Sequence, residues 1–211
     1  MKLALGSVQF GLDYGVTNTS GKVSINECHE ILRIAIDSGI SVLDTAADYG
    51  CSEQLLGQLE ISQKFSMVTK VSSNSLLASG GAERSIRTSL ANLRRESIDV
   101  LLLHNELDLL SDNADRNYRQ LIKLKNSGLV NKIGVSVYSV TAAQKILSRY
   151  HIDLIQIPAN HLDRRFEHSG VIKQAKKERV EIHARSLFLQ GLLAVESSER
   201  PVAFQKIPEL S

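Results

Sequence analysis

Residues 41–49 read SVLDTAADY, a short apolar run that ends in polar residues. Two later stretches have the same form: SMVTK at residues 66–70 and DVLLLH at residues 99–104. Each apolar run has the length and composition of a buried β-strand. In an α/β barrel the carboxyl ends of successive strands converge on one rim, where the active site forms. The sequence therefore predicts four side chains at one site: Asp44, Tyr49, Lys70 and His104.

The alternation of apolar run and amphipathic helix recurs along the chain. The apolar runs predict seven strands, at Leu3–Val8, Ser41–Asp44, Ser66–Val71, Asp99–His104, Lys132–Val137, Asp153–Ile157 and Val180–Ala184. Helical patterns lie between these runs. One begins at Ser24, which forms a capping box with Glu27 and precedes an apolar helix face. Such alternation indicates parallel strands joined by right-handed crossovers.

Two architectures satisfy this alternation, a closed barrel and a doubly wound open sheet. The first strand is not followed by Gly-x-Gly-x-x-Gly, and the chain has no Walker phosphate loop. We therefore predict an α/β fold of the (β/α)8 TIM-barrel type. Seven strands and six helices fall short of eight units, so the barrel is expected to be incomplete, with the last β/α unit missing. We assign residues 1–211 to this single domain.

Composition excludes several classes of function. The chain has 211 residues, 43% of them hydrophobic, and a net charge of +2, which argues against nucleic-acid or membrane partners. Cys28 and Cys51 are too few for a disulfide framework, so we expect a cytoplasmic protein. His161 and His168 match no metal motif and have arginines beside them, so we expect no metal.

The four predicted site residues together have the chemistry needed to donate a proton to a substrate. Taken singly, each has an ordinary structural interpretation, but their occurrence at successive strand ends favours catalysis. We expect Lys70, paired with Asp44, to lower the pKa of the Tyr49 phenol and so make it a better acid. His104 would orient a carbonyl oxygen. This set of groups suits the reduction of a carbonyl compound by hydride.

The sequence also resembles the aldo-keto reductase family from the first strand to about Leu193. The matching segments are LGSVQFG, VLDTAADYGCSEQLLG, SMVTK, SIDVLLLH, LKNSGLVNKIGVSVYS, LIQIPAN and HARSLFLQGLL. The opening LGSVQFGLDYG and the DRRF and RSLFLQGLL stretches look like the branch found among polysaccharide-biosynthesis proteins. In this family, the order Asp44, Tyr49, Lys70, His104 matches the catalytic tetrad.

The resemblance implies NADPH- or NADH-dependent reduction of an aldehyde, ketone or oxidised sugar, with Tyr49 as the general acid. It also implies four cofactor-binding positions. Ser136 and Gln156 match residues that bind the carboxamide, Ser186 matches one near the pyrophosphate, and Arg185 stands where an aromatic residue often stacks on the nicotinamide. Two departures are Val137, where Asn is common, and Asn105, where some members have an aromatic residue. Asn105 implies a polar pocket and a sugar-like substrate.

Length is the largest departure from the family pattern. The resemblance implies that the absent last unit would bind adenosine and its 2′-phosphate, so we expect weak NADPH binding by a C-terminally truncated chain. Unpaired strand edges predict a homo-oligomer. A shortened gene, a partner copy that completes the barrel and a portion of a longer protein all remain open. So does a second function, a catalytically silent chain that acts as a binding or regulatory subunit. Substrate identity and the choice between NADPH and NADH are open as well.

Overall fold

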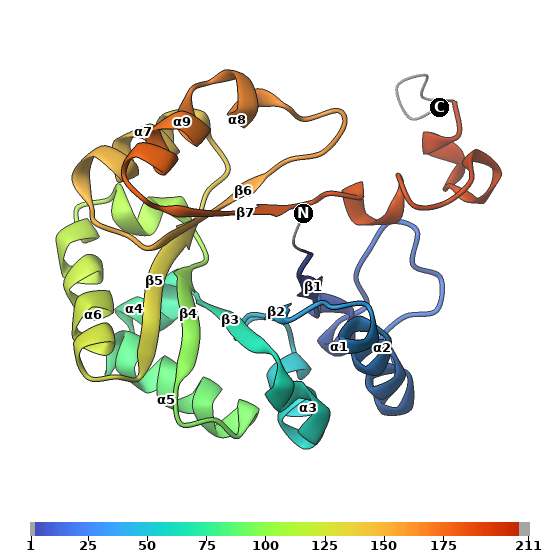
Figure 1. The fold of residues 1–211 in the computed structure, drawn as a ribbon, viewed down its shortest axis with the longest axis horizontal. Helices are drawn as coiled ribbons and strands as arrows, with labels where there is room; N and C mark the ends of the chain where they lie inside the picture. The colour runs from blue at the N-terminus through green and yellow to red at the C-terminus, as the bar shows by residue number, and fades with distance from the viewer. Residues whose placement is uncertain (1–2, 207–211) are drawn as a thin grey trace.

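Seven parallel strands form one curled sheet in the computed structural model, which describes residues 3–206. The strands follow chain order: β1 (Leu5–Gly6), β2 (Val42–Asp44), β3 (Ser66–Val71), β4 (Ile98–Leu103), β5 (Val130–Ser136), β6 (Leu154–Pro158) and β7 (Glu181–Arg185). Figure 1 shows the helices arranged around the outside of this sheet. The predicted incomplete β/α barrel is confirmed.

Nine α-helices connect or flank the strands within residues 3–206. They are α1 (Val8–Gly11), α2 (Ile25–Asp37), α3 (Ser52–Gln58), α4 (Ser73–Leu77), α5 (Gly81–Leu93), α6 (Ala114–Asn126), α7 (Val140–Arg149), α8 (Arg165–His168) and α9 (Val171–Lys177). Short 3-10 helices span Glu60–Lys64, Glu106–Leu109, Leu189–Gly191, Ser197–Glu199 and Val202–Phe204. The predicted capping box of α2 is confirmed, because the Ser24 hydroxyl accepts from Glu27 N and the Glu27 carboxylate accepts from Ser24 N. In this part of the chain no helix is both long and apolar enough to cross a membrane.

The two faces of the sheet have different surroundings. The outer face packs on the helices in a large apolar core, represented by Leu101 and Ile133 against Ile86 and Leu121. The inner face carries a small apolar cluster of Val68, Val100, Leu102 and Leu154, with Val42 packed against it. Side chains two residues apart share a face of a strand. Lys70 therefore lies one step beyond Val68 towards the carboxyl ends, and Gln156 one step beyond Leu154.

The first strand is shorter than the predicted Leu3–Val8, because the chain turns into α1 directly after it. Ser7 N still donates to Asp44 O at 2.9 Å, but Val8 already begins the helix. The turn packs on the loop after β2: a Cβ placed on Gly11 would lie 1.7 Å from Tyr49 O. This close backbone contact was not visible in the apolar pattern of the strand.

The two end strands of the described sheet, β1 and β7, each pair with one neighbour only. The 3-10 turn after β7 approaches the loop after α1, where Thr17 Oγ1 donates to Gln190 O at 3.2 Å. Figure 1 shows this segment running past the N-terminal half of the sheet. The association of copies through these edges stays a prediction.

Gly134 provides a test of how tightly the inner face is packed. A Cβ on this residue would lie 2.0 Å from Leu154 O of the neighbouring strand, so Gly134→Ala must push β5 and β6 apart. We expect a loss of about 3 kcal/mol in the free energy of unfolding, measured by urea denaturation. Gly6→Ala is the matched control, because nothing lies within 4 Å of its added Cβ. Equal stability of the two variants would contradict the close approach of β5 and β6 at Gly134.

Candidate active site

All eight predicted site residues line one cavity of about 380 Å³ at the carboxyl ends of the strands. They are Asp44, Tyr49, Lys70, His104, Ser136, Gln156, Arg185 and Ser186. Tyr14, Tyr138 and Gln190 also line the cavity, although the sequence analysis did not identify them. Tyr14 and Tyr138 lie in loops and Gln190 lies in a short 3-10 helix, where no strand periodicity indicates the direction of a side chain. The structure thus brings the predicted residues together, and their catalytic and binding roles remain to be tested.

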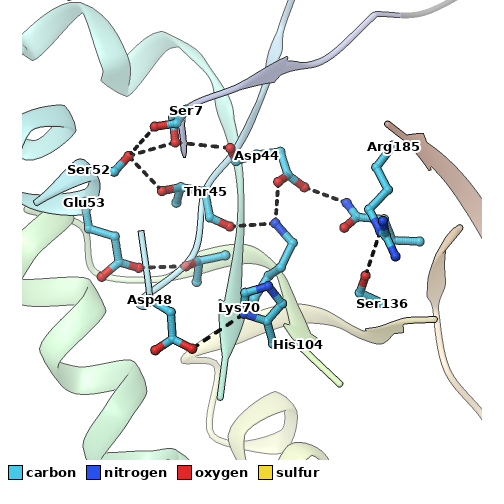
Figure 2. Close-up of polar contacts among 12 residues, drawn as sticks. Ser7, Asp44, Thr45, Asp48, Ser52, Glu53, Lys70, His104, Ser136 and Arg185 are labelled. Carbon is cyan, nitrogen blue, oxygen red and sulfur yellow. Dashed lines mark hydrogen bonds and ion pairs between the residues drawn. The ribbon is translucent and has the colours of Figure 1, made fainter. Parts of the chain in front are cut away.

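A buried ion pair lies at the floor of the cavity. Lys70 is 2% exposed and donates from Nζ to the Asp44 carboxylate and to Thr45 O, the latter at 2.8 Å. Gln156 Nε2 donates to the other oxygen of Asp44 at 2.7 Å. Figure 2 shows the contact between Lys70 of β3 and the Asp44 carboxylate, which also accepts from Gln156 of β6. A charge removed from water requires such partners. Here Lys70 and Asp44 are paired with each other, and each also has a neutral polar partner, Thr45 O for Lys70 and Gln156 Nε2 for Asp44.

Tyr49 lies above this pair, in the loop between β2 and α3. Lys70 Nζ is 5.1 Å from the centroid of the phenol ring. The His104 ring lies edge-on to it, with the two centroids 5.9 Å apart. Gly50 follows with φ +56°, and a Cβ there would lie 2.4 Å from Gly11 O, so the loop needs glycine at this position.

A group of buried hydroxyls holds the base of the same loop. Ser52 Oγ lies 2.8 Å from Ser7 Oγ and 3.2 Å from Thr45 Oγ1, and it donates to Ser7 O at 3.0 Å. Figure 2 shows these contacts joining the segments that follow β1 and β2 to the start of α3. The loop that carries Tyr49 is therefore tied to the sheet at both ends.

The expected effect on the pKa of Tyr49 is wrong in direction. Burial raises the pKa of the Tyr49 phenol well above its ordinary value, and the negative charge of Asp44 raises it further. The physical reason is that removing the phenol from water penalises the phenolate. The charge of Lys70 is already offset by Asp44, to which it is hydrogen-bonded. The phenol therefore keeps its proton at neutral pH.

His104 directly follows β4, and its backbone N donates to Val71 O at 3.0 Å. Its Nδ1 lies 3.7 Å from a carboxylate oxygen of Asp48, as Figure 2 shows. Burial, followed by the positive charge of Lys70, lowers the pKa of the imidazole from its ordinary value. The ring is therefore neutral at pH 7 and presents one N–H donor and one acceptor.

Arg185 is the last residue of β7, and its side chain connects several residues that line the cavity. It donates from Nε to Ser136 Oγ at 3.2 Å and from Nη2 to Val137 O at 3.1 Å. The guanidinium carbon lies 3.9 Å from the centroid of the Tyr138 ring. Nη1 also donates to Ser186 Oγ at 3.3 Å. The two serines predicted to contact a cofactor are thus hydrogen-bonded to this arginine.

One buried polar atom in the cavity has no hydrogen-bond partner within residues 3–206. Gln156 is 3% exposed, its Nε2 is used by Asp44, and its Oε1 accepts no hydrogen bond from residues 3–206. A buried carbonyl oxygen without a donor is costly, so the site is prepared for an N–H group from a ligand. A carboxamide supplies that donor. The residues present therefore fit a nicotinamide at this position.

A second cavity, of about 540 Å³, shares His104 and Tyr138 with the first. Its other lining residues are mostly polar: Asp48, Ser72, Ser73, Asn74, Asn105, Glu106 and Leu107. Asn105 also has a structural task, because its side chain accepts from Leu107 N at the start of a 3-10 helix. Within residues 3–206, no group of three or more His, Cys, Asp or Glu side chains is arranged to hold a metal.

Comparisons with known proteins give a consistent result. The model of the Aldo/keto reductase family matches residues 2–209. The chain is 26% identical to the aldo-keto reductase YhdN of Bacillus subtilis, over 93% of this chain and 59% of that protein. It is 28% identical to a putative aldo-keto reductase of Pseudomonas aeruginosa, with a TM-score of 0.73 over 93% of this chain and 75% of that one. An aldo/keto reductase of Klebsiella pneumoniae solved with NADP and acetate has a TM-score of 0.72 at 22% identity, over 89% of this chain and 64% of that one.

Removing the buried lysine tests the ion pair. Lys70→Met leaves the Asp44 carboxylate with only Gln156 as a partner, so we expect unfolding to become easier by about 3 kcal/mol in urea denaturation. The double variant with Asp44→Asn should lose less than the sum of the two single variants, by about 1 kcal/mol or more.

Lys123→Met is the control, because Lys123 forms an ion pair with Glu83 at the surface and should cost less than about 1 kcal/mol. Strict additivity of the Asp44 and Lys70 substitutions would contradict the coupling of the two charges.

Proposed function

Because this chain belongs to the aldo/keto reductase family, whose members are oxidoreductases, we propose that it reduces a carbonyl compound to an alcohol with a reduced nicotinamide cofactor. Tyr49 is the proposed general acid. The chain spans 59% of the length of YhdN, so the activity is proposed for the residues at hand and not carried over from the relative. The substrate class is an aldehyde, a ketone or an oxidised sugar.

The observation that carries this proposal is that three groups line one cavity: the protonated Tyr49 phenol, the Lys70–Asp44 ion pair and the neutral His104. The Lys70 ammonium and the His104 ring both lie close to the phenol ring. Addition of hydride to a carbonyl carbon leaves negative charge on oxygen, which must receive a proton. Tyr49 holds that proton at neutral pH, and the Lys70 ammonium lies 5.1 Å from the centroid of its ring. His104 can donate a hydrogen bond that orients the carbonyl oxygen.

A reduced nicotinamide, when bound, supplies the hydride. The residues that would hold it are Gln156 and Ser136 at the carboxamide, Arg185 against the ring and Ser186 towards the pyrophosphate. Support comes from the unpartnered Oε1 of Gln156 and from the Klebsiella protein of the same fold, which was solved with NADP. Preference for NADPH, and weak affinity of the 211-residue chain for it, stay predictions.

The substrate would extend from Tyr49 into the second cavity. His104 and Tyr138 line both spaces, so the two cavities are neighbours on either side of these residues. The hydroxyl, amide and carboxylate groups that line it suit a substrate with several hydroxyl groups. We therefore favour a sugar-like carbonyl compound over a lipid aldehyde.

Removing the phenolic hydroxyl tests the role of Tyr49. We expect Tyr49→Phe to lower the rate of NADPH-dependent aldehyde reduction by roughly 10²–10⁴-fold, because the proton donor is lost while the ring stays. The rate is followed by the loss of NADPH absorbance. Tyr118→Phe is the control, since that hydroxyl donates to His151 O outside the cavity.

Unchanged turnover in Tyr49→Phe would remove Tyr49 from the chemistry. No turnover by the parent chain across a panel of carbonyl compounds at saturating cofactor would instead favour the binding or regulatory subunit.

The pKa directions predict the pH dependence of the reduction. The reaction uses the protonated phenol, whose pKa is raised, so ionisation of Tyr49 should not reduce kcat between about pH 6 and about pH 9. His104, with its lowered pKa, is neutral from about pH 7 upwards. We therefore expect a flat profile of kcat between about pH 7 and about pH 9 in buffers of constant ionic strength. A decline with a midpoint near neutral pH would show that the phenol ionises more easily than the structure implies.

A further inference from the structure

The charges that line the first cavity do not balance. Asp44 and Lys70 neutralise each other, and His104 is neutral at pH 7. Arg185 is the remaining charged side chain of the lining, and within residues 3–206 no carboxylate lies within ion-pair distance of it. Its hydrogen-bond partners are two hydroxyls and a backbone carbonyl, none of which carries a formal charge. The cavity therefore holds one uncompensated positive charge.

That charge lies beside the proposed nicotinamide position. Arg185 Nε is 3.2 Å from Ser136 Oγ, and Ser136 is the register partner of Gln156 on the neighbouring strand. A carboxamide that donates to the free Oε1 of Gln156 is therefore a close neighbour of the guanidinium. Tyr138 covers one face of the guanidinium, at 3.9 Å, and fixes its position. Figure 2 shows Arg185 and Ser136 joined by this contact, on the side of the site opposite Ser7 and Ser52.

We propose that Arg185 determines which redox form of the cofactor this chain binds, by favouring the reduced nicotinamide over the oxidised one. This inference rests on the proposed function. The oxidised ring carries a positive charge that the guanidinium repels, whereas the reduced ring is neutral. The adenosine and phosphate groups are the same in both forms, so their contribution cancels in the ratio of the two affinities. The same repulsion favours release of the oxidised cofactor once hydride has been transferred.

The expected size follows from the interaction of two unit charges several ångströms apart. In a partly solvated protein site this repulsion is on the order of tenfold in an equilibrium constant. An aromatic residue at this position would cause no such repulsion, because a neutral aromatic ring attracts the positively charged oxidised nicotinamide.

The experiment measures the dissociation constants of NADPH and NADP⁺ by calorimetric titration of the whole chain. We compare the parent with Arg185→Met, which removes the charge, and with Arg185→Lys, which keeps it. The ratio of the NADP⁺ constant to the NADPH constant should fall about tenfold in Arg185→Met and stay near the parent value in Arg185→Lys. Arg149→Met is the matched control, because Arg149 also stacks on a tyrosine, Tyr150, but outside the cavity. Melting curves establish that each variant is folded.

A second measurement needs no variant. Raising the salt concentration screens the repulsion, so the ratio for the parent chain should shrink as ionic strength rises. An equal ratio in the parent and in Arg185→Met, or a ratio indifferent to salt, would overturn the inference. The proposed function would then still stand if the parent reduces an aldehyde. Failure of the parent to bind either nucleotide would overturn both.

Discussion

Lys70 is almost completely buried, and a lysine in that position keeps its charge only if the surrounding chain supplies partners. Its partners are the carboxylate of Asp44, which ends β2, and the carbonyl of Thr45, the next residue. Gln156 of β6 donates to the second oxygen of the Asp44 carboxylate. The charge thus constrains the relative positions of three strands that are distant in sequence. Tyr49 and His104 take their places around the ammonium group, so the geometry of the whole cavity depends on this ion pair.

The same pair explains the electrostatic character of the site. Because the charges of Lys70 and Asp44 offset each other, the pKa of the Tyr49 phenol is set mainly by its removal from water, which raises it. The phenol therefore retains its proton. Arg185 differs, since its partners are neutral and its charge is free to act on whatever enters the cavity. Lys70 therefore holds the residues at the base of the cavity in place, and Arg185 provides the positive charge that acts on a bound ligand.

The scaffold beneath the site follows from the two faces of the sheet. Its outer face packs against helices through a broad apolar core, whereas its inner face has room for only a few aliphatic side chains below the polar layer. Gly134 keeps β5 and β6 at normal separation where their inner faces meet. On the other side of the cavity, Ser7 and Ser52 join the segment after β1 to the start of α3 and so hold the Tyr49 loop.

The sequence by itself determined the seven strands, their parallel order and the convergence of Asp44, Lys70 and His104, because strand periodicity and the ends of apolar runs are local signals. It could not determine the early end of β1, which depends on a backbone contact between Gly11 and Tyr49. Only the tertiary structure decided that burial, and not the nearby ammonium, governs the pKa of Tyr49. These outcomes depend on the distances and solvent exposure of groups far apart in the chain, which no local pattern records.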